Sequence, residues 1–127
     1  MRLPDLAKEL IDNQTFATLA TVNADGSPQT SVIWVKREDD DVIFSTITGR
    51  RKTFNMRRNP NVSLLLFDPE DPYTYAEIRG TVQLTPEGGP ELIQELSHLY
   101  DEKPFHEKHP EVERLVCRLT PTRVITR

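Results

Sequence analysis

The side chains with the clearest chemical potential lie in one short basic segment, in which Arg50, Arg51 and Lys52 directly follow a glycine. Arginine offers a planar fork of donors and lysine a compact point charge, and both are well suited to bind a phosphate oxygen. The hydroxyls of Ser45 and Thr46, just upstream, add neutral donors. This combination of residue types points to a phosphate monoester as the ligand.

The elements expected around the basic segment favour the same ligand. The chain leaves a strand at residues 41–46, turns at Gly49 and enters a helix that ends near Asn59, before Pro60. A helix N-terminus presents free backbone N–H groups and a partial positive charge, which together attract anions. The alternative is a capped helix whose basic side chains are merely solvated, and the residues alone leave both interpretations open.

Charge distribution adds to the case for an anionic ligand. The 127-residue chain has a formal net charge of −4, which argues against general nucleic-acid binding because that needs a broad basic footprint. Between Asp41 and Asp68 there is nevertheless no acidic residue, while five Lys or Arg residues fall in that window. Positive charge is thus concentrated in one place in an otherwise acidic protein.

Length and composition predict one cytoplasmic domain covering residues 1–127. A hydrophobic share of 36% and a charged share of 28% are ordinary for a globular protein. We expect no membrane association, because no apolar run approaches the roughly 20 residues that cross a bilayer. The N-terminus lacks the features of a signal peptide, and the single Cys117 cannot form an intrachain disulfide.

The hydrophobic pattern predicts a mainly β protein of the α+β class. An Asp25-Gly26 turn between two β-rich runs indicates a hairpin, and Gly80 suggests a break in a long strand. Short turns between successive strands favour antiparallel pairing. Strands are expected at residues 15–23, 28–36, 41–46, 61–67, 73–85 and 112–126, and helices at 4–13, 50–59 and 88–100. We therefore expect a six-stranded antiparallel barrel with short flanking helices.

Two other candidate sites are weaker. His106 and His109 have a spacing that zinc sites can use, but the segment is polar and offers no clear second pair of ligands, so we predict no metal. Cys117 falls in an expected strand, where a buried cysteine behaves as a small hydrophobe rather than as a reactive thiol.

Several segments, in their order and spacing, resemble the pyridoxamine-phosphate-oxidase-like split-barrel flavoproteins. The most specific is Arg51-Lys52-Thr53-Phe54-Asn55-Met56-Arg57-Arg58-Asn59-Pro60 followed by an apolar strand. Residues 17–22, 25–29, 75–82 and 119–124 agree with the family in style. The resemblance covers about residues 15–124 and implies an FMN-binding split barrel.

Within this superfamily the chain looks most like the branch that uses the deazaflavin coenzyme F420. It is short, has the Arg-Lys-Thr-x-Asn form of the helix, and carries Ser27-Pro28-Gln29-Thr30-Ser31 at its second strand. It also lacks the Arg-rich C-terminal segment of a true pyridoxamine phosphate oxidase. FMN remains the alternative cofactor, because both molecules carry a phosphate on a ribityl chain.

The resemblance implies a homodimer with two cofactor sites at the subunit interface. Arg51 and Lys52 would hold the cofactor phosphate, helped by Thr53 and Asn55. The remaining cofactor contacts that it implies are weaker: Ser45 and Thr46 along the ribityl chain, the strand Gln29, Thr30, Ser31 and Val32 along the ring, Tyr73 and Tyr75 from the second subunit, and Arg50 near the acidic tail of F420.

The implied activity is hydride transfer from the reduced cofactor to a small conjugated or heteroaromatic substrate. The cofactor ring carries this chemistry, and no catalytic side chain is indicated. One alternative is a protein that binds F420, flavin or a tetrapyrrole without turnover. Another is a nucleic-acid-binding barrel, which the acidic net charge and the few aromatic residues on the strands argue against.

Overall fold

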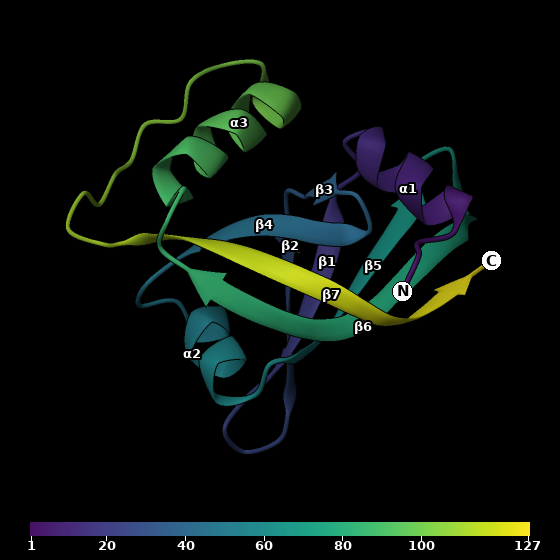
Figure 1. Cartoon of the computed structure of the whole chain (residues 1–127), viewed down its shortest axis with the longest axis horizontal. Helices are drawn as coiled ribbons and strands as arrows, with labels where there is room; N and C mark the ends of the chain where they lie inside the picture. The colour runs from purple at the N-terminus through teal and green to yellow at the C-terminus, as the bar shows by residue number, and fades with distance from the viewer.

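The computed structural model describes residues 1–127 and consists of three helices and seven strands (Figure 1). The helices are α1 (Asp5–Asp12), α2 (Arg51–Arg58) and α3 (Gly89–Asp101). The strands are β1 (Ala17–Val22), β2 (Pro28–Ile33), β3 (Lys36–Glu38), β4 (Asp41–Ile47), β5 (Asn61–Asp68), β6 (Asp71–Thr85) and β7 (Arg114–Thr126). The predicted α+β class and antiparallel pairing are confirmed.

All seven strands form one curled sheet in the order β2-β1-β5-β6-β7-β4-β3. The two edge strands, β2 and β3, are consecutive in the chain and are joined only by Trp34 and Val35. Such a link can span no more than about 10 Å, so the two edges of the sheet must lie near each other. Because β2 and β3 do not pair, the sheet curls without closing into a hydrogen-bonded barrel.

The prediction of six strands is wrong, because the expected strand at 28–36 is divided into β2 and β3. The cause lies far away in the sequence, in Tyr100 of α3. Its hydroxyl accepts a hydrogen bond from Val35 N at 3.0 Å and lies 2.8 Å from Val35 O and 3.0 Å from Thr15 O. The Val35 backbone is thus satisfied by a side chain in place of a strand partner.

The break expected at Gly80 is confirmed as a register shift between β6 and β7. Gly80 pairs with Pro121, and the register changes between Arg79 and Gly80. A Cβ at Gly80 would lie 2.1 Å from Thr120 O, so only glycine allows this close approach. Pro121 also fits here, because an irregularity in pairing tolerates a residue without an N–H.

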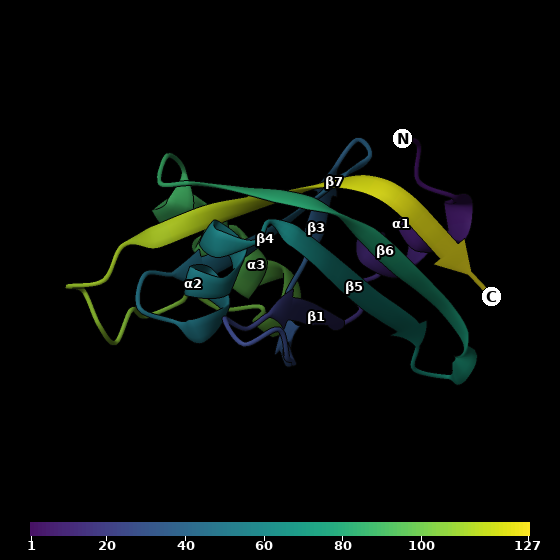
Figure 2. The ribbon, with the colours of Figure 1, turned by 90° about the horizontal axis from the view of Figure 1, so that it is seen from below.

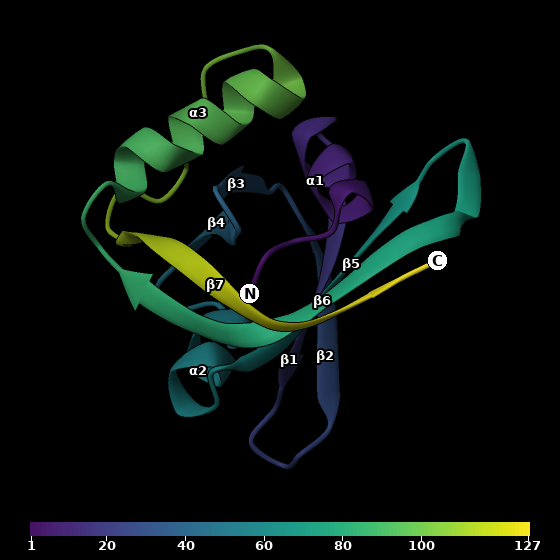
Figure 3. The same cartoon turned by 45° about the vertical axis from the view of Figure 1, so that its right-hand side comes forward.

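The helices cover different parts of the curled sheet. Figures 1 and 3 show α2 and α3 on opposite sides of the β4–β7 strand pair, with α1 across the open end of the sheet. Figure 2 shows the β5–β6 hairpin extending beyond the rest of the sheet. The largest core cluster joins both halves of the sheet, with Leu10 of α1, Leu64 of β5 and Phe44 of β4 among its buried members. None of the three helices has the length and hydropathy that a membrane crossing requires.

Candidate functional site

The predicted basic segment lies between β4 and α2, where two backbone features shape the turn. Gly49 has a φ of +95°, which L side chains rarely adopt, so a glycine lets the chain turn here. Arg50 is the N-cap residue of α2 with an extended backbone. The helix thus begins directly after the turn, as the sequence predicts.

Thr53 and Asn55 are both buried and face the protein interior. The Thr53 hydroxyl donates to Ile47 O at 2.6 Å and lies 2.9 Å from the Thr46 hydroxyl. The Asn55 amide donates to Thr21 Oγ1 at 3.0 Å and to Asn23 Oδ1 at 2.9 Å. These contacts tie α2 to β4 and to the β1–β2 hairpin, so the structure gives both side chains an anchoring role.

A cavity of about 240 Å³ lies beside the start of α2, and five of the thirteen predicted site residues line it. It is formed by residues from β2, the β2–β3 link, β4, α3 and β7, from the turn before α2 and its first residues, and from the segment after α3. The lining residues are Val32, Ile33, Trp34, Ser45, Thr46, Arg50, Lys52, Ile93, Leu96, Phe105 and Arg114. The cavity therefore has a cationic part and an apolar part, and no acidic residue lines it.

We refer to this 240 Å³ space as the anion cavity. Among its cations, Lys52 has the least favourable electrostatic surroundings. Its Nζ donates to Ser31 Oγ at 3.3 Å and forms no salt bridge. Burial lowers the pKa of Lys52, and the positive charges of Arg50 and Arg114 lower it further. Three cations thus surround a space without a carboxylate, and an anion placed there would relieve their repulsion.

Arg114, at the start of β7, is not among the site residues that the sequence predicts. It is 69 residues from Ser45 in the sequence, and its position depends on the β4–β7 pairing. In the sequence, Arg114 follows the acidic residues Glu107, Glu111 and Glu113. The local net charge therefore gives no sign that Arg114 could bind an anion. Only the register, in which Arg114 lies opposite Ile47, brings it to the cavity.

The other predicted residues lie outside the anion cavity, in several places. Thr30 and Tyr75 line a larger cavity of about 570 Å³ on the outer face of β1, β2, β5 and β6. Gln29 accepts a 3.3 Å hydrogen bond from the Thr21 hydroxyl. Tyr73 is highly exposed at the β5–β6 turn, and Arg51 is exposed and lines neither cavity.

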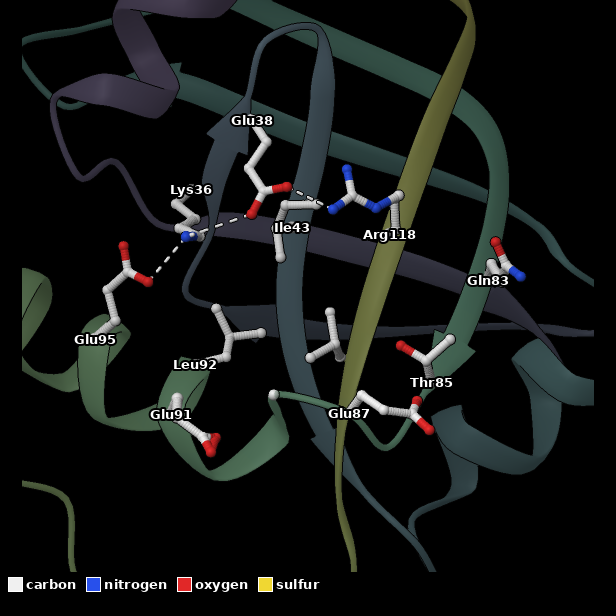
Figure 4. A pocket seen from close by; sticks show the side chains of 12 residues that line it. Lys36, Glu38, Ile43, Gln83, Thr85, Glu87, Glu91, Leu92, Glu95 and Arg118 are labelled. Carbon is white, nitrogen blue, oxygen red and sulfur yellow. Dashed lines mark hydrogen bonds and ion pairs between the residues drawn. The ribbon is translucent and has the colours of Figure 1, made fainter.

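A third cavity of about 310 Å³ lies between α3 and the outer side of β3, β4, β6 and β7, and no predicted site residue lines it. Figure 4 shows the chain of ion pairs along one side of it. Lys36 bridges Glu95 of α3, at 2.8 Å, and Glu38 of β3, at 3.7 Å, and Glu38 in turn pairs with Arg118 of β7. Because its cations are already paired with carboxylates, this cavity offers no comparable attraction to an anion.

Cys117 is fully buried in β7, and burial raises the pKa of its thiol to about 12. A thiol in this state is a poor nucleophile. His109 lies in the segment after α3, and its exposed side chain has Nδ1 3.5 Å from Oε1 of Glu111. The structure contains no cluster of three or more His, Cys, Asp or Glu side chains arranged to bind a metal.

Part of the sequence is similar to proteins described as pyridoxine/pyridoxamine 5'-phosphate oxidases. The pyridoxine/pyridoxamine 5'-phosphate oxidase of Bordetella pertussis is 43% identical over 51 residues, which is 39% of this chain and 24% of that protein. The matched segment thus spans about a quarter of the length of this relative.

Solved structures match over nearly the whole chain. A protein described as an F420 reductase has a TM-score of 0.88 and 28% identity over 98% of this chain and 100% of its own. A conserved hypothetical protein of Mycobacterium tuberculosis has a TM-score of 0.76 and 22% identity over 98% of this chain and 83% of its own.

The family model described as pyridoxamine 5'-phosphate oxidase matches residues 3–127. The resemblance seen in the sequence is therefore confirmed, and the match extends across the strands, the basic segment and α2. This chain belongs to the pyridoxamine 5'-phosphate oxidase family.

Proposed function

We propose that this protein binds a phosphate-bearing flavin-type cofactor, coenzyme F420 in the first place and FMN as the alternative, and uses it to reduce a small conjugated or heteroaromatic substrate. The observation that carries the proposal is Lys52, a partly buried cation with no carboxylate partner in a cavity that it shares with Arg50. The similarity to an F420 reductase over the full chain supports F420 as the first choice.

The dimensions and polarity of the cavities fit a cofactor bound in two parts. The anion cavity, at about 240 Å³, is smaller than the roughly 300–1,000 Å³ of a typical whole-ligand pocket. It is therefore suited to the phosphate and the ribityl chain. The ring would lie along β2 toward the 570 Å³ cavity, because Val32 lines the first cavity and Thr30 the second.

In this proposal each group of residues has a separate role. Arg50 and Lys52 bind the phosphate, and the exposed Arg51 adds to the positive field at its entrance. Ser45 and Thr46 contact the ribityl chain. A bound flavin or deazaflavin supplies the hydride chemistry itself. The edge strand β2 pairs only with β1, so residues 29–32 keep one row of free backbone N–H and C=O groups for the polar rim of the ring.

The 570 Å³ cavity lies on an apolar sheet face that a single copy of the chain leaves open. Leu65 and Phe67 of β5 are exposed there, and Val32 of β2 is 67% exposed nearby. We propose that a second copy covers this face in a homodimer and that its Tyr73 and Tyr75 pack on the cofactor. Sedimentation of the wild type and of Leu65→Glu tests this, because a charge on this face should convert dimer to monomer.

The cofactor proposal is tested by intrinsic fluorescence, since the only tryptophan, Trp34, lines the anion cavity. FMN and F420 are titrated separately into the wild type and Lys52→Ala. Loss of one charge-assisted contact of about 1.5–3 kcal/mol should weaken binding roughly 10–100-fold. Lys103→Ala, an exposed lysine outside the cavity, is the matched control and should bind as the wild type does.

Absence of binding of both cofactors at concentrations of about 100 μM would refute the proposal. Equal affinity in the wild type and Lys52→Ala would assign the basic segment to a solvated helix instead. Turnover is a separate question, answered by adding candidate conjugated substrates to the reduced cofactor complex. If the cofactor binds but is never oxidised, the protein is a carrier rather than an enzyme.

A further inference from the structure

Arg114 presents two edges of its guanidinium group to two different surroundings. Nε and Nη2 donate to the Glu107 carboxylate at 3.1, 3.0 and 2.8 Å. On the other edge, Nη1 reaches Ser45 Oγ at 3.4 Å, a long and weak hydrogen bond. Because Ser45 lines the anion cavity, the incompletely satisfied edge of Arg114 faces that cavity.

The position of this guanidinium is restricted from several sides. Its plane is packed over Phe105, with Cζ 5.1 Å from the ring centroid. Phe105 is itself fixed to α3 by two hydrogen bonds between its backbone and the Gln94 amide, at 2.7 and 3.0 Å. The Arg114 backbone packs against the start of α3, since a Cβ at Gly89 would lie 2.0 Å from Arg114 O. The side chain is only 14% exposed.

Glu107 lies on the side of Arg114 that faces away from the anion cavity. It lines a separate cavity of about 430 Å³ between α3 and the segment that follows it, and it does not line the anion cavity. An anion could therefore contact Nη1 without displacing the Glu107 carboxylate from Nε and Nη2. The ion pair holds the guanidinium in an orientation suited to a second, separate contact.

We propose that Arg114 is a third anion-binding group of the anion cavity and that Glu107 is a positioning residue, which orients it by holding the opposite edge. The inference rests on the proposed phosphate site and extends it. Arg50, Lys52 and Arg114 together with one carboxylate leave two positive charges. This balance matches a phosphate monoester, which carries about −1.5 to −2 at pH 7, better than it matches a monocarboxylate.

The probe is inorganic phosphate, with acetate as a monoanion for comparison, and binding is followed by Trp34 fluorescence and by calorimetry. Arg114→Ala should weaken phosphate binding roughly 10–100-fold, as expected for loss of a charge-assisted contact. Acetate should bind more weakly than phosphate to the wild type, and the preference should shrink in the variant. Millimolar guanidinium ion should restore phosphate binding to Arg114→Ala and leave the wild type unchanged.

The role of Glu107 is tested by a double-mutant cycle. Glu107→Gln should weaken phosphate binding several-fold in the wild-type background and have no effect in the Arg114→Ala background, because it acts through Arg114. A role in general stability of the segment would persist in both backgrounds. Glu111→Gln, a neighbouring exposed carboxylate, is the control and should bind phosphate like the wild type.

The outcomes separate this inference from the cofactor proposal. Unchanged phosphate affinity in Arg114→Ala, with FMN or F420 binding that still depends on Lys52, overturns the inference alone. Phosphate binding that depends on Arg114, without binding of either cofactor, supports the inference and overturns the cofactor proposal. If Arg114→Ala does not fold, Arg114→Lys serves instead, and its single ammonium should leave phosphate binding weaker than in the wild type. Wild-type affinity in a folded Arg114→Lys protein overturns the inference.

Discussion

Replacement of Asn55 distinguishes an anchoring residue from a ligand-binding one. In Asn55→Ala, the two hydrogen bonds from the amide to Thr21 and Asn23 are lost, along with the one that its oxygen accepts from Arg58 at 3.3 Å. Each neutral hydrogen bond contributes about 1 kcal/mol net, and a buried polar group left without a partner costs about 1–3 kcal/mol. Thr21 is 2% exposed and would lose its donor.

The free energy of unfolding of Asn55→Ala should therefore fall by about 2–4 kcal/mol. For a chain of this size the corresponding decrease in Tm is roughly 10 °C. The assay is thermal and urea unfolding without any ligand, followed by circular dichroism. Asn61→Ala removes an exposed asparagine amide that bonds only to Asn59, and it should change stability by less than about 0.5 kcal/mol.

The opposite pattern would refute this reasoning. If Asn55→Ala unfolds like the wild type but loses affinity for FMN or F420, then Asn55 binds the cofactor directly and the helix is anchored by other groups. If stability and affinity both fall, the cofactor effect should be reproduced by other changes that loosen α2 from the hairpin, such as Thr21→Val.

Two further predictions follow from the ionisation of buried groups. Burial and neighbouring cations lower the pKa of Lys52 below 10.5, so binding of inorganic phosphate requires proton uptake once the pH exceeds this lowered value. Affinity should thus decline as the pH rises through this lowered pKa, with the decline moved to higher pH in Lys52→Arg, and an identical pH profile in both proteins would contradict the assignment. Cys117, with a pKa of about 12, should resist thiol reagents in the folded protein and react only after denaturation. Native labelling at the denatured rate would show that β7 opens readily.

The sequence was sufficient for features that depend on local chemistry. The hairpin at Asp25-Gly26, the glycine turn into α2 and the irregularity at Gly80 all follow from residues that are adjacent in the chain. The division of the second strand could not be predicted in this way, because it depends on Tyr100, 65 residues from Val35. The number of strands was therefore wrong although the class and pairing were correct.

The site shows the same division between local and distant information. Polar residues occur on every side of α2, so the sequence does not reveal that Thr53 and Asn55 point inward whereas Arg51 is exposed. Their orientation is decided by hydrogen-bond partners in β1, β4 and the hairpin, which the fold brings together. Arg114 is missing from the local charge pattern for the same reason, since only the β4–β7 register places it beside Ser45.

The distribution of partners among the cations explains why the anion cavity is the best candidate for a ligand. Several other cations at the sheet surface pair with carboxylates, as Arg37 does with Asp12 and Arg118 with Asp41. Such pairs cancel most of the charge at those places, whereas the three cations of the anion cavity share a single carboxylate, Glu107, and keep a net positive charge. Lys52 has no such partner although it is partly desolvated, which makes its charge costly in the unliganded protein. The single 3.3 Å hydrogen bond to Ser31 compensates little of this cost, whereas a bound phosphate would compensate more, and the phosphate titrations measure this difference.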